Sequence, residues 1–311
     1  MSYLAENNVL QLYENNNANQ STWVMGFRNW RDFFAEFGGE IDGEINGDGI
    51  NTSFTAEKRQ VRMNVTSIPV REIEDSGNGN FLKGLENATK DLALALERRH
   101  LYSQKDYRNV EVTGYVQVLE ESDNGDNRGI VWFGPSGRHT GSMEDNERDT
   151  RGCWGSTYKT NYNTNDNDMR IQKECWHVNY DMRDKKDVGD RFKNLKKRGV
   201  KHVCFVFERN GKPGRRIESW VDLKGIDTNT NKPKNEWKLV NVEEDHPDLQ
   251  RWGNRMRLCN CATDTQIILW GGPLVTYRWD FSRIVLSHAT VQEIDPPTVG
   301  NFHSVGTVIE E

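Results

Sequence analysis

The sequence predicts an all-β fold, an antiparallel sandwich or jelly roll with one inserted helix. Short runs rich in β-branched and aromatic residues recur along the chain, separated by Asn/Asp/Gly clusters at 161–168 and 226–235. The regular alternation of strand and helix that builds a parallel sheet is missing. The runs predicted as strands are 52–70, 107–120, 129–135, 170–180, 201–209, 216–224, 236–244, 265–280 and 283–294.

One stretch, residues 80–100, has helical periodicity. Leu82, Leu85, Leu92 and Leu96 follow a period near 3.6, and two arginines close the run. Because it lies between strand-like segments, we interpret it as an insertion on a β scaffold. The predicted organisation is an arm over 1–22, a β domain over 23–297 with a helical insertion at 80–104, and a tail over 298–311.

Composition excludes several classes of protein. The net charge is −6 and the pI about 5.8, which disfavours a nucleic-acid partner. No run approaches the roughly 18 apolar residues of a membrane-spanning helix. The first residues show neither the basic nor the apolar region of a signal peptide. Either the protein is not exported by that route or a signal has been removed.

Cysteine and acidic residues offer weak metal signals. Cys204 lies in an apolar strand pattern and is predicted to be a buried thiol. Cys153 is expected near Cys259 or Cys261, as a disulfide if the compartment is oxidising. Zinc is disfavoured because the usual C-x₂₋₄-C pairs are absent. An acidic loop at 42–48 could bind a structural calcium ion but lacks the EF-hand spacing. No other cofactor is expected.

The run 170–180, RIQKECWHVNY, is the most distinctive polar stretch. In one extended strand, one face would carry the even-numbered residues, including Arg170, Gln172 and Glu174, and the other would carry Lys173 and His177. The pattern fits either the floor of a polar groove or a solvated edge strand.

Several short sequence motifs occur together, and their order resembles that in a known group of proteins. They are QVRMNV (60–65), NVEVTGY (109–115), GRHT (137–140), GCWGSTYK (152–159), RIQKECWHVNY (170–180), ESWVD (218–222), WGGPLVTYRWD (270–280) and VQEIDPP (291–297). The group consists of mostly archaeal, largely uncharacterised secreted proteins with a concanavalin-like β-jelly roll. These proteins are similar in architecture to jelly-roll polysaccharide lyases. The resemblance spans roughly residues 23 to 297.

The resemblance implies a carbohydrate-active protein, by analogy a lyase that cleaves uronic-acid glycosides by β-elimination. Such chemistry needs a cation or amide to neutralise the uronate, a base for the C5 proton and an acid for the leaving oxygen. The expected catalytic residues are His177, Tyr158, Tyr180 and Lys173. The expected substrate-binding residues are Arg138, His139, Lys159, Asn179, Trp220 and Glu218.

Two other functions fit the same pattern. One is a non-catalytic glycan-binding jelly roll, and the other is a structural surface or virion protein whose terminal arms contact neighbouring copies. The expected partner is an acidic polysaccharide, and homo-oligomers through the arms are a further expectation. The resemblance suggests an extracellular or surface location.

Overall fold

The computed structural model describes fourteen segments of the 311-residue chain. They are residues 2–5, 7–15, 22–24, 50–55, 60–65, 97–121, 129–136, 157–164, 166–175, 179–189, 197–249, 267–269, 271–280 and 282–310.

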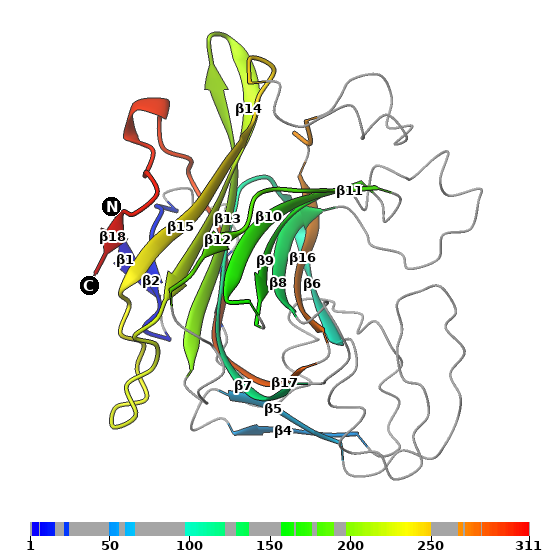
Figure 1. The fold of residues 1–311 in the computed structure, drawn as a ribbon, viewed down its shortest axis with the longest axis vertical. Helices are drawn as coiled ribbons and strands as arrows, with labels where there is room; N and C mark the ends of the chain where they lie inside the picture. Colours follow the sequence, from blue (N-terminus) through cyan, green and yellow to red (C-terminus); the bar gives the residue numbers. More distant parts are fainter. Residues whose placement is uncertain are drawn as a thin grey trace, which may run out of the picture.

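The described chain is all β and forms a jelly roll of two curved antiparallel sheets (Figure 1). A seven-stranded sheet has the order β11 (Asn179–Met182), β10 (Asp168–Cys175), β9 (Thr157–Asn163), β8 (Gly129–Ser136), β16 (Gly272–Asp280) and β6 (Glu97–Tyr107), and β12 (Lys186–Asp187) also pairs with β10. Strands distant in sequence, such as β8 and β16, are therefore neighbours in the sheet.

The second sheet has nine strands. Its order is β18 (Val308–Ile309), β15 (Trp237–Asp245), β14 (Lys212–Asp222), β13 (Arg198–Arg209), β7 (Val110–Glu121), β17 (Ser282–Glu293), β5 (Gln60–Val65) and β4 (Ile50–Thr55), and β3 (Thr22–Val24) also pairs with β17. A small hairpin of β1 (Tyr3–Leu4) and β2 (Leu10–Gln11) and a short 3₁₀ helix, η3 (Val299–Asn301), lie outside the two sheets.

Alternation along the strands builds two apolar cores. Side chains that face inward from both sheets, among them Trp132, Tyr162, Ile171 and Ile217, are fully buried between the sheets. The opposite faces of β7, β13, β14 and β15 carry a second apolar set, which includes Phe205 and Trp220. Each cluster buries bulky apolar area that stabilises the fold.

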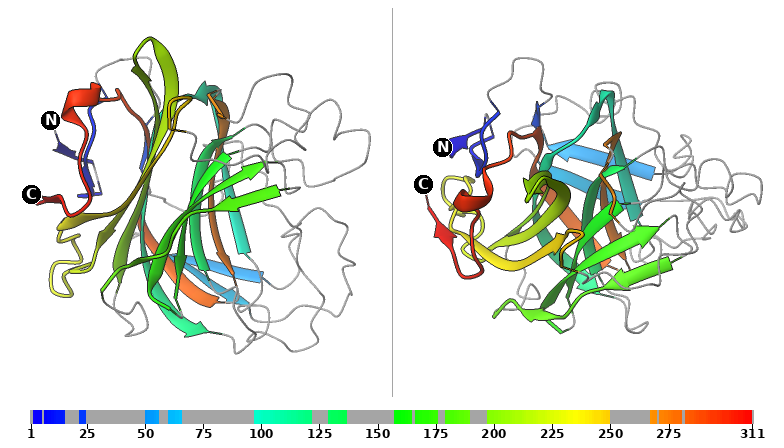
Figure 2. Two further views of the ribbon diagram at one scale, coloured as in Figure 1. Left: turned by 45° about the horizontal axis from the view of Figure 1, so that its top comes forward. Right: turned by 90° about the horizontal axis from the view of Figure 1, so that it is seen from above.

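The second core is closed by the two ends of the chain. The termini lie side by side on the far side of the nine-stranded sheet from the seven-stranded one (Figures 1 and 2). Four residues of the N-terminal segment belong to this cluster, namely Val9, Leu10, Leu12 and Tyr13. Near the C-terminus, Ile294 belongs to it, and Phe302 and Ile309 pack against it. Both ends therefore belong to the folded body of the protein.

The hairpin from β13 to β14 shows how the sequence sets local geometry. Arg209 pairs with Lys212, so only Asn210 and Gly211 form the loop. Both have positive φ, 54° and 70°. That conformation defines a type I′ turn, which Asn-Gly adopts with little strain and which matches the right-handed twist of the strands.

The predicted β architecture is confirmed, with corrections. Most predicted strands are present, but residues 52–70 contain two strands, β4 and β5. Residues 97–104, predicted as the end of the helical insertion, lie in strand β6. These residues follow the leucines that carry the helical period, and their pairing with β16 makes them a strand. Residues 80–96 lie outside the described residues.

The predicted single strand over 170–180 is wrong. β10 ends at Cys175, and β11 begins at Asn179 and runs antiparallel to it, with Cys175 opposite Asn179. The chain therefore reverses direction between β10 and β11, so Lys173 and Asn179 do not lie on one strand. Period-two alternation is the same in a hairpin as in a long strand, so it does not reveal the reversal. The described residues contain no helix long and apolar enough to span a membrane.

Candidate functional site

Strands β9 and β10 have one face turned into the sandwich. Tyr158 donates a hydrogen bond of 2.6 Å to Asp245 Oδ2 on the opposite sheet, and Lys173 forms an ion pair with the same oxygen. Thr160 contacts His202 Nδ1 at 2.9 Å. These contacts show that residues 158, 160 and 173 point inward. Burial raises the pKa of Tyr158 well above its usual value, and Asp245 raises it further.

The opposite face of the same two strands is polar along its whole length. Because successive side chains alternate and cross-strand partners share a face, the remaining residues point away from the nine-stranded sheet. The four cross-strand pairs are Thr157–Glu174, Lys159–Gln172, Asn161–Arg170 and Asn163–Asp168. We call these eight residues the polar strip. It contains no aliphatic or aromatic residue.

One end of the polar strip is buried. Lys159 forms an ion pair with Glu174, and both side chains are almost fully buried. The ammonium group also lies 4.6 Å from the centre of the Phe133 ring on β8. A charged pair out of water contributes little net stability, since desolvation offsets the attraction. This pair is therefore a candidate for a role other than folding.

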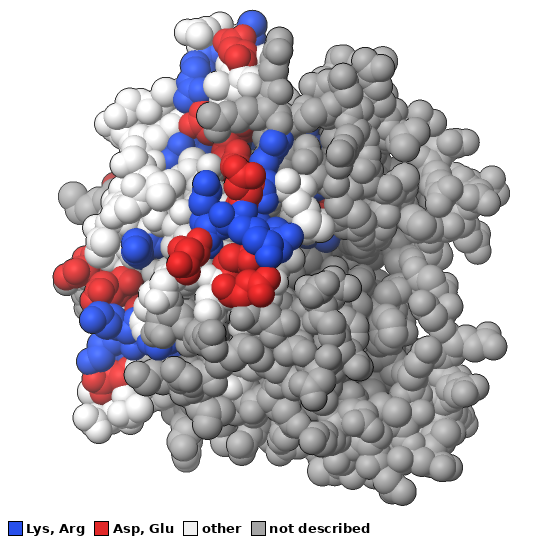
Figure 3. All heavy atoms as spheres, viewed as in Figure 1, with Lys and Arg blue, Asp and Glu red and all other residues white. Residues whose placement is uncertain are grey.

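The third pair of the polar strip is more open, whereas the end pair, Asn163 and Asp168, is buried. Asn161 and Arg170 are both partly exposed. Asp168 pairs with Lys185, with a nitrogen–oxygen distance of 3.0 Å, and Lys185 also reaches Asp166 at 2.9 Å. Figure 3 shows that acidic and basic atoms are interspersed on the described part of the face that it displays. A ligand at this end would meet both signs of charge.

The predicted site residues fall into three groups. Arg138, His139 and His177 lie outside the described residues. Asn179 and Tyr180 are described by their backbone alone, and Tyr180 is the register partner of Glu174. Lys159 belongs to the polar strip, whereas Tyr158 and Lys173 are buried between the sheets.

Glu218 and Trp220 lie elsewhere, on the outer face of the nine-stranded sheet, and are fully buried. Glu218 accepts hydrogen bonds from Arg216 Nε at 2.6 Å, from the Tyr13 hydroxyl at 2.5 Å and from Trp220 Nε1 at 3.0 Å. Every partner is a group of the same chain. The structure does not bring Glu218 or Trp220 together with the polar strip.

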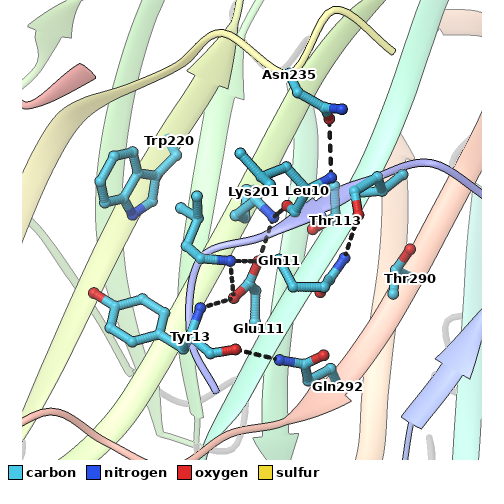
Figure 4. Close-up of polar contacts among 12 residues, drawn as sticks. Leu10, Gln11, Tyr13, Glu111, Thr113, Lys201, Trp220, Asn235, Thr290 and Gln292 are labelled. Atoms are coloured by element: carbon cyan, nitrogen blue, oxygen red, sulfur yellow. Dashed lines mark hydrogen bonds and ion pairs between the residues drawn. The ribbon is translucent and has the colours of Figure 1, made fainter. Parts of the chain in front are cut away.

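A second polar cluster surrounds residues 7–15, which we call the arm segment (Figure 4). Glu111 accepts hydrogen bonds from the backbone N–H groups of Leu12 and Tyr13, at 3.0 and 3.2 Å. Lys201 pairs with Glu111 and donates to the Leu10 carbonyl at 2.9 Å. The arm segment thus lies against the nine-stranded sheet, whose side chains bind its backbone.

Two amide side chains also bind the backbone of the arm segment. Asn235 accepts from Leu10 N–H at 2.9 Å and donates to the Asn8 carbonyl at 2.9 Å. Gln292 donates to the Tyr13 carbonyl at 2.8 Å. The sequence showed only a short apolar patch in an Asn-rich arm. The polar partners come from β7, β13, β17 and the loop before β15, so no local pattern reveals them.

The described residues contain no group of three or more His, Cys, Asp or Glu side chains placed to hold a metal ion. Cys204 is a free, buried thiol, as predicted. The predicted proximity of Cys153 to Cys259 or Cys261, and the acidic loop at 42–48, lie outside the described residues.

No protein-family model matches this chain, and no curated protein has a significantly similar sequence. Among solved structures, a protein of unknown function with a galectin-like fold from Bacillus subtilis is 10% identical, with a TM-score of 0.41 over 92% of this chain and 100% of that one. The carbohydrate-binding module CBM66 from Bacillus subtilis is 12% identical, with a TM-score of 0.32 over 63% and 81% of the two chains.

Lectin I-B4 from Griffonia simplicifolia, in a metal-free form, is also similar in structure. It is 10% identical, with a TM-score of 0.38 over 87% of this chain and 98% of that one. At identities and TM-scores this low, the assignment of a jelly roll rests on the strand order and pairing of the chain itself.

Proposed function

We propose that the protein binds glycans on the outer face of its seven-stranded sheet, along the polar strip. The observation that supports this is the composition of that face: four successive cross-strand pairs of β9 and β10 consist of polar side chains. A sheet face that served only to pack would carry apolar residues. Keeping two carboxylates, two cations and three amides there costs stability unless they have partners.

The residue types suit a sugar. Carboxylates and amides accept and donate hydrogen bonds to hydroxyl groups, and both are present within two neighbouring strands. Phe133 on β8 packs beside Lys159 and supplies an apolar face next to them. Arg170, partly exposed, is the accessible cation of the polar strip and supports a preference for glycans that carry carboxylates.

Binding assays with Arg170 and Asn161 variants test this proposal. Titration calorimetry with uronate-containing oligosaccharides should show at least a tenfold weaker affinity for Arg170→Ala, and a smaller loss for Asn161→Ala. Arg209→Ala, on the β13–β14 hairpin, is the matched control and should bind as the wild type does. Equal affinities for all four proteins would refute the assignment of this face.

Cleavage of uronate glycans by β-elimination is a second candidate. Arg170 and Gln172, a cation and an amide on one strand face, are the groups that would neutralise a uronate carboxylate. Tyr180, at the register position opposite Glu174, and His177 remain the predicted acid and base. Incubation with a panel of uronate polysaccharides should generate an ultraviolet-absorbing unsaturated product. If glycans bind and none is cleaved, the protein is a binding module.

We further propose that the protein acts outside the cell or at its surface, where such polysaccharides occur. A structural calcium ion and homo-oligomers formed through the terminal arms remain proposals of the same kind. In the structure, the arm segment is bound by residues of its own chain.

A further inference from the structure

Arg215 on β14 carries a buried positive charge with incomplete hydrogen bonding. The residue is fully buried. Its Nη1 donates a hydrogen bond of 2.8 Å to the Arg108 carbonyl. Its Nε and Nη2 have no oxygen or nitrogen acceptor in the part of the chain that the structure describes, where the Cys204 thiol is a further group that interacts with this side chain. A guanidinium group out of water normally pairs with a carboxylate, because an unpaired charge there is costly.

The nearest carboxylate on the adjacent strand does not pair with Arg215. Asp245 on β15 is the register partner of Arg215, and its Oδ2 already accepts from Lys173 and Tyr158. Among the described residues, no ion pair joins Arg215 to any carboxylate. The Nε–Nη2 edge, which usually binds two oxygens at once, is left open.

The region around Arg215 holds other charged groups among the described residues. Its cations are Lys173, Arg183 and Arg215, and Arg183 acts electrostatically on Asp245. Its carboxylates are Asp245 and Glu243, whose register partner Ile217 faces the core between the sheets. Asp245 already forms an ion pair with Lys173, so its charge is not held by Arg215 alone.

Neighbouring titratable groups do not supply the missing negative charge. Burial raises the pKa of the Cys204 thiol. The charge of Arg215 and its hydrogen bond with Cys204 offset this only in part, so the thiol stays neutral near pH 7. His202 is held neutral by burial, and its pKa falls to about 4. A neutral thiol and a neutral imidazole leave the guanidinium uncompensated.

We propose that one small monovalent anion, a carboxylate of the size of formate or a halide, binds between the two sheets on the Nε–Nη2 edge of Arg215. Such an anion supplies both a counter-charge and hydrogen-bond acceptors, which Arg215 lacks among the described residues. The site faces the interior, whereas the polar strip faces outward, so this inference does not depend on glycan binding.

Thermal unfolding of the full chain in different sodium salts tests the site. The protein is measured in gluconate, an anion too large for a closed interior, and gluconate is then replaced stepwise by formate, chloride, bromide or nitrate at constant ionic strength. Binding to the native state alone should raise Tm in a saturable way by about 2–4 °C for at least one small anion. Identical Tm values in all the salts would overturn the proposal.

Two variants localise the effect. Arg215→Met keeps most of the side-chain volume, removes the charge and should abolish the dependence of Tm on the anion. Arg209→Met, a partly exposed arginine of the same hairpin that pairs with Glu244, is the control and should retain it. Retention of the anion effect in Arg215→Met would assign the binding to another place and refute the site.

Crystallography of the wild type in bromide tests the anion site independently, in case Arg215→Met does not fold. Wild-type crystals grown in bromide should show an anomalous peak within hydrogen-bonding reach of Arg215 Nε and Nη2. An ordered guanidinium without a peak beside it would overturn the proposal.

Discussion

The outer faces of the two sheets carry the same combination of a buried ion pair and an aromatic ring, but the two combinations differ in what surrounds them. On the nine-stranded sheet, Lys201 and Glu111 form a buried ion pair, with the ammonium group 4.5 Å from the centre of the Trp237 ring. On the seven-stranded sheet, Lys159 and Glu174 form a buried ion pair beside Phe133, at 4.6 Å. Each sheet thus presents a cation, a carboxylate and an aromatic ring together.

The difference lies in what the pairs bind. Glu111 and Lys201 hold the backbone of the arm segment, so this outer face recognises an extended piece of the chain itself. The pair of Lys159 and Glu174 belongs to a polar strip whose other members include partly exposed groups. The ion pair on the nine-stranded sheet thus stabilises the fold, and we propose that the ion pair on the seven-stranded sheet contributes to ligand binding.

The largest expected effect is that of Glu111→Ala. The change leaves Lys201 buried without its ion-pair partner and removes the acceptor for Leu12 and Tyr13. The free energy of unfolding should fall by about 3–5 kcal/mol, as measured by urea denaturation. Lys234→Met, which breaks an exposed pair with Asp227, should leave it unchanged within error. A small effect for Glu111→Ala would mean that the arm segment is not anchored there.

The protein should lose stability in mild acid when His202 is protonated. This side chain forms hydrogen bonds between the inner faces of the two sheets. Its Nε2 lies 3.1 Å from the Gly134 carbonyl and its Nδ1 contacts Thr160. Burial lowers the pKa of His202 from 6.5 to about 4. The unfolded chain therefore binds the proton more readily, so this contribution is complete above pH 6.5 and is lost as the pH falls towards 4.

The expected cost is about 1.4 kcal/mol per pH unit, approaching 3 kcal/mol at pH 4. Denaturation curves of the wild type and of His202→Gln, recorded from pH 7 to pH 4, isolate this contribution as the difference between the two proteins. The variant can keep both hydrogen bonds but does not titrate. Parallel pH profiles of the two proteins would show that protonation of His202 does not lower the free energy of unfolding.

Two double variants compare the faces directly. Lys201→Met with Glu111→Leu removes the charges but leaves the Leu12 and Tyr13 amides without their acceptor, at a cost of about 2 kcal/mol. Lys159→Met with Glu174→Leu should be neutral to within about 1 kcal/mol, since apolar groups can replace a buried ion pair. The second variant should instead lose glycan affinity. Equal losses of stability would erase the distinction between the two faces.

The sequence predicts the fold better than the site. Strands such as β13 and β14 carry alternation and an Asn-Gly turn, which are local signals, and both are present in the structure. Residues 97–104 show the limit of such signals, because they are predicted to end the helical insertion but pair with β16 as a strand.

The site depends on contacts that alternation does not encode. The pattern separates Gln172 and Glu174 from Lys173 on β10, but it does not say which face turns inward. Tyr158 and Lys173 point at Asp245, which is 72 residues distant from Lys173 in sequence. Such a partner is known only once the two sheets are packed together.

The smallest expected effect is that of Tyr13→Phe, which removes one hydroxyl from the arm segment. This hydroxyl donates to Glu218, which keeps its bonds from Arg216 and Trp220. Because the carboxylate stays satisfied, the cost should be only about 1 kcal/mol. Hydrogen exchange should reveal it as faster exchange of the Leu12 and Tyr13 amides, with core amides such as Val203 unaffected.

Arg170→Ala on the other face should leave the exchange of both arm amides unchanged, since the polar strip makes no contact with the arm segment among the described residues. If Arg170→Ala loosened the arm amides as much as Tyr13→Phe does, the two faces would be coupled through the sandwich and could not be assigned separate roles.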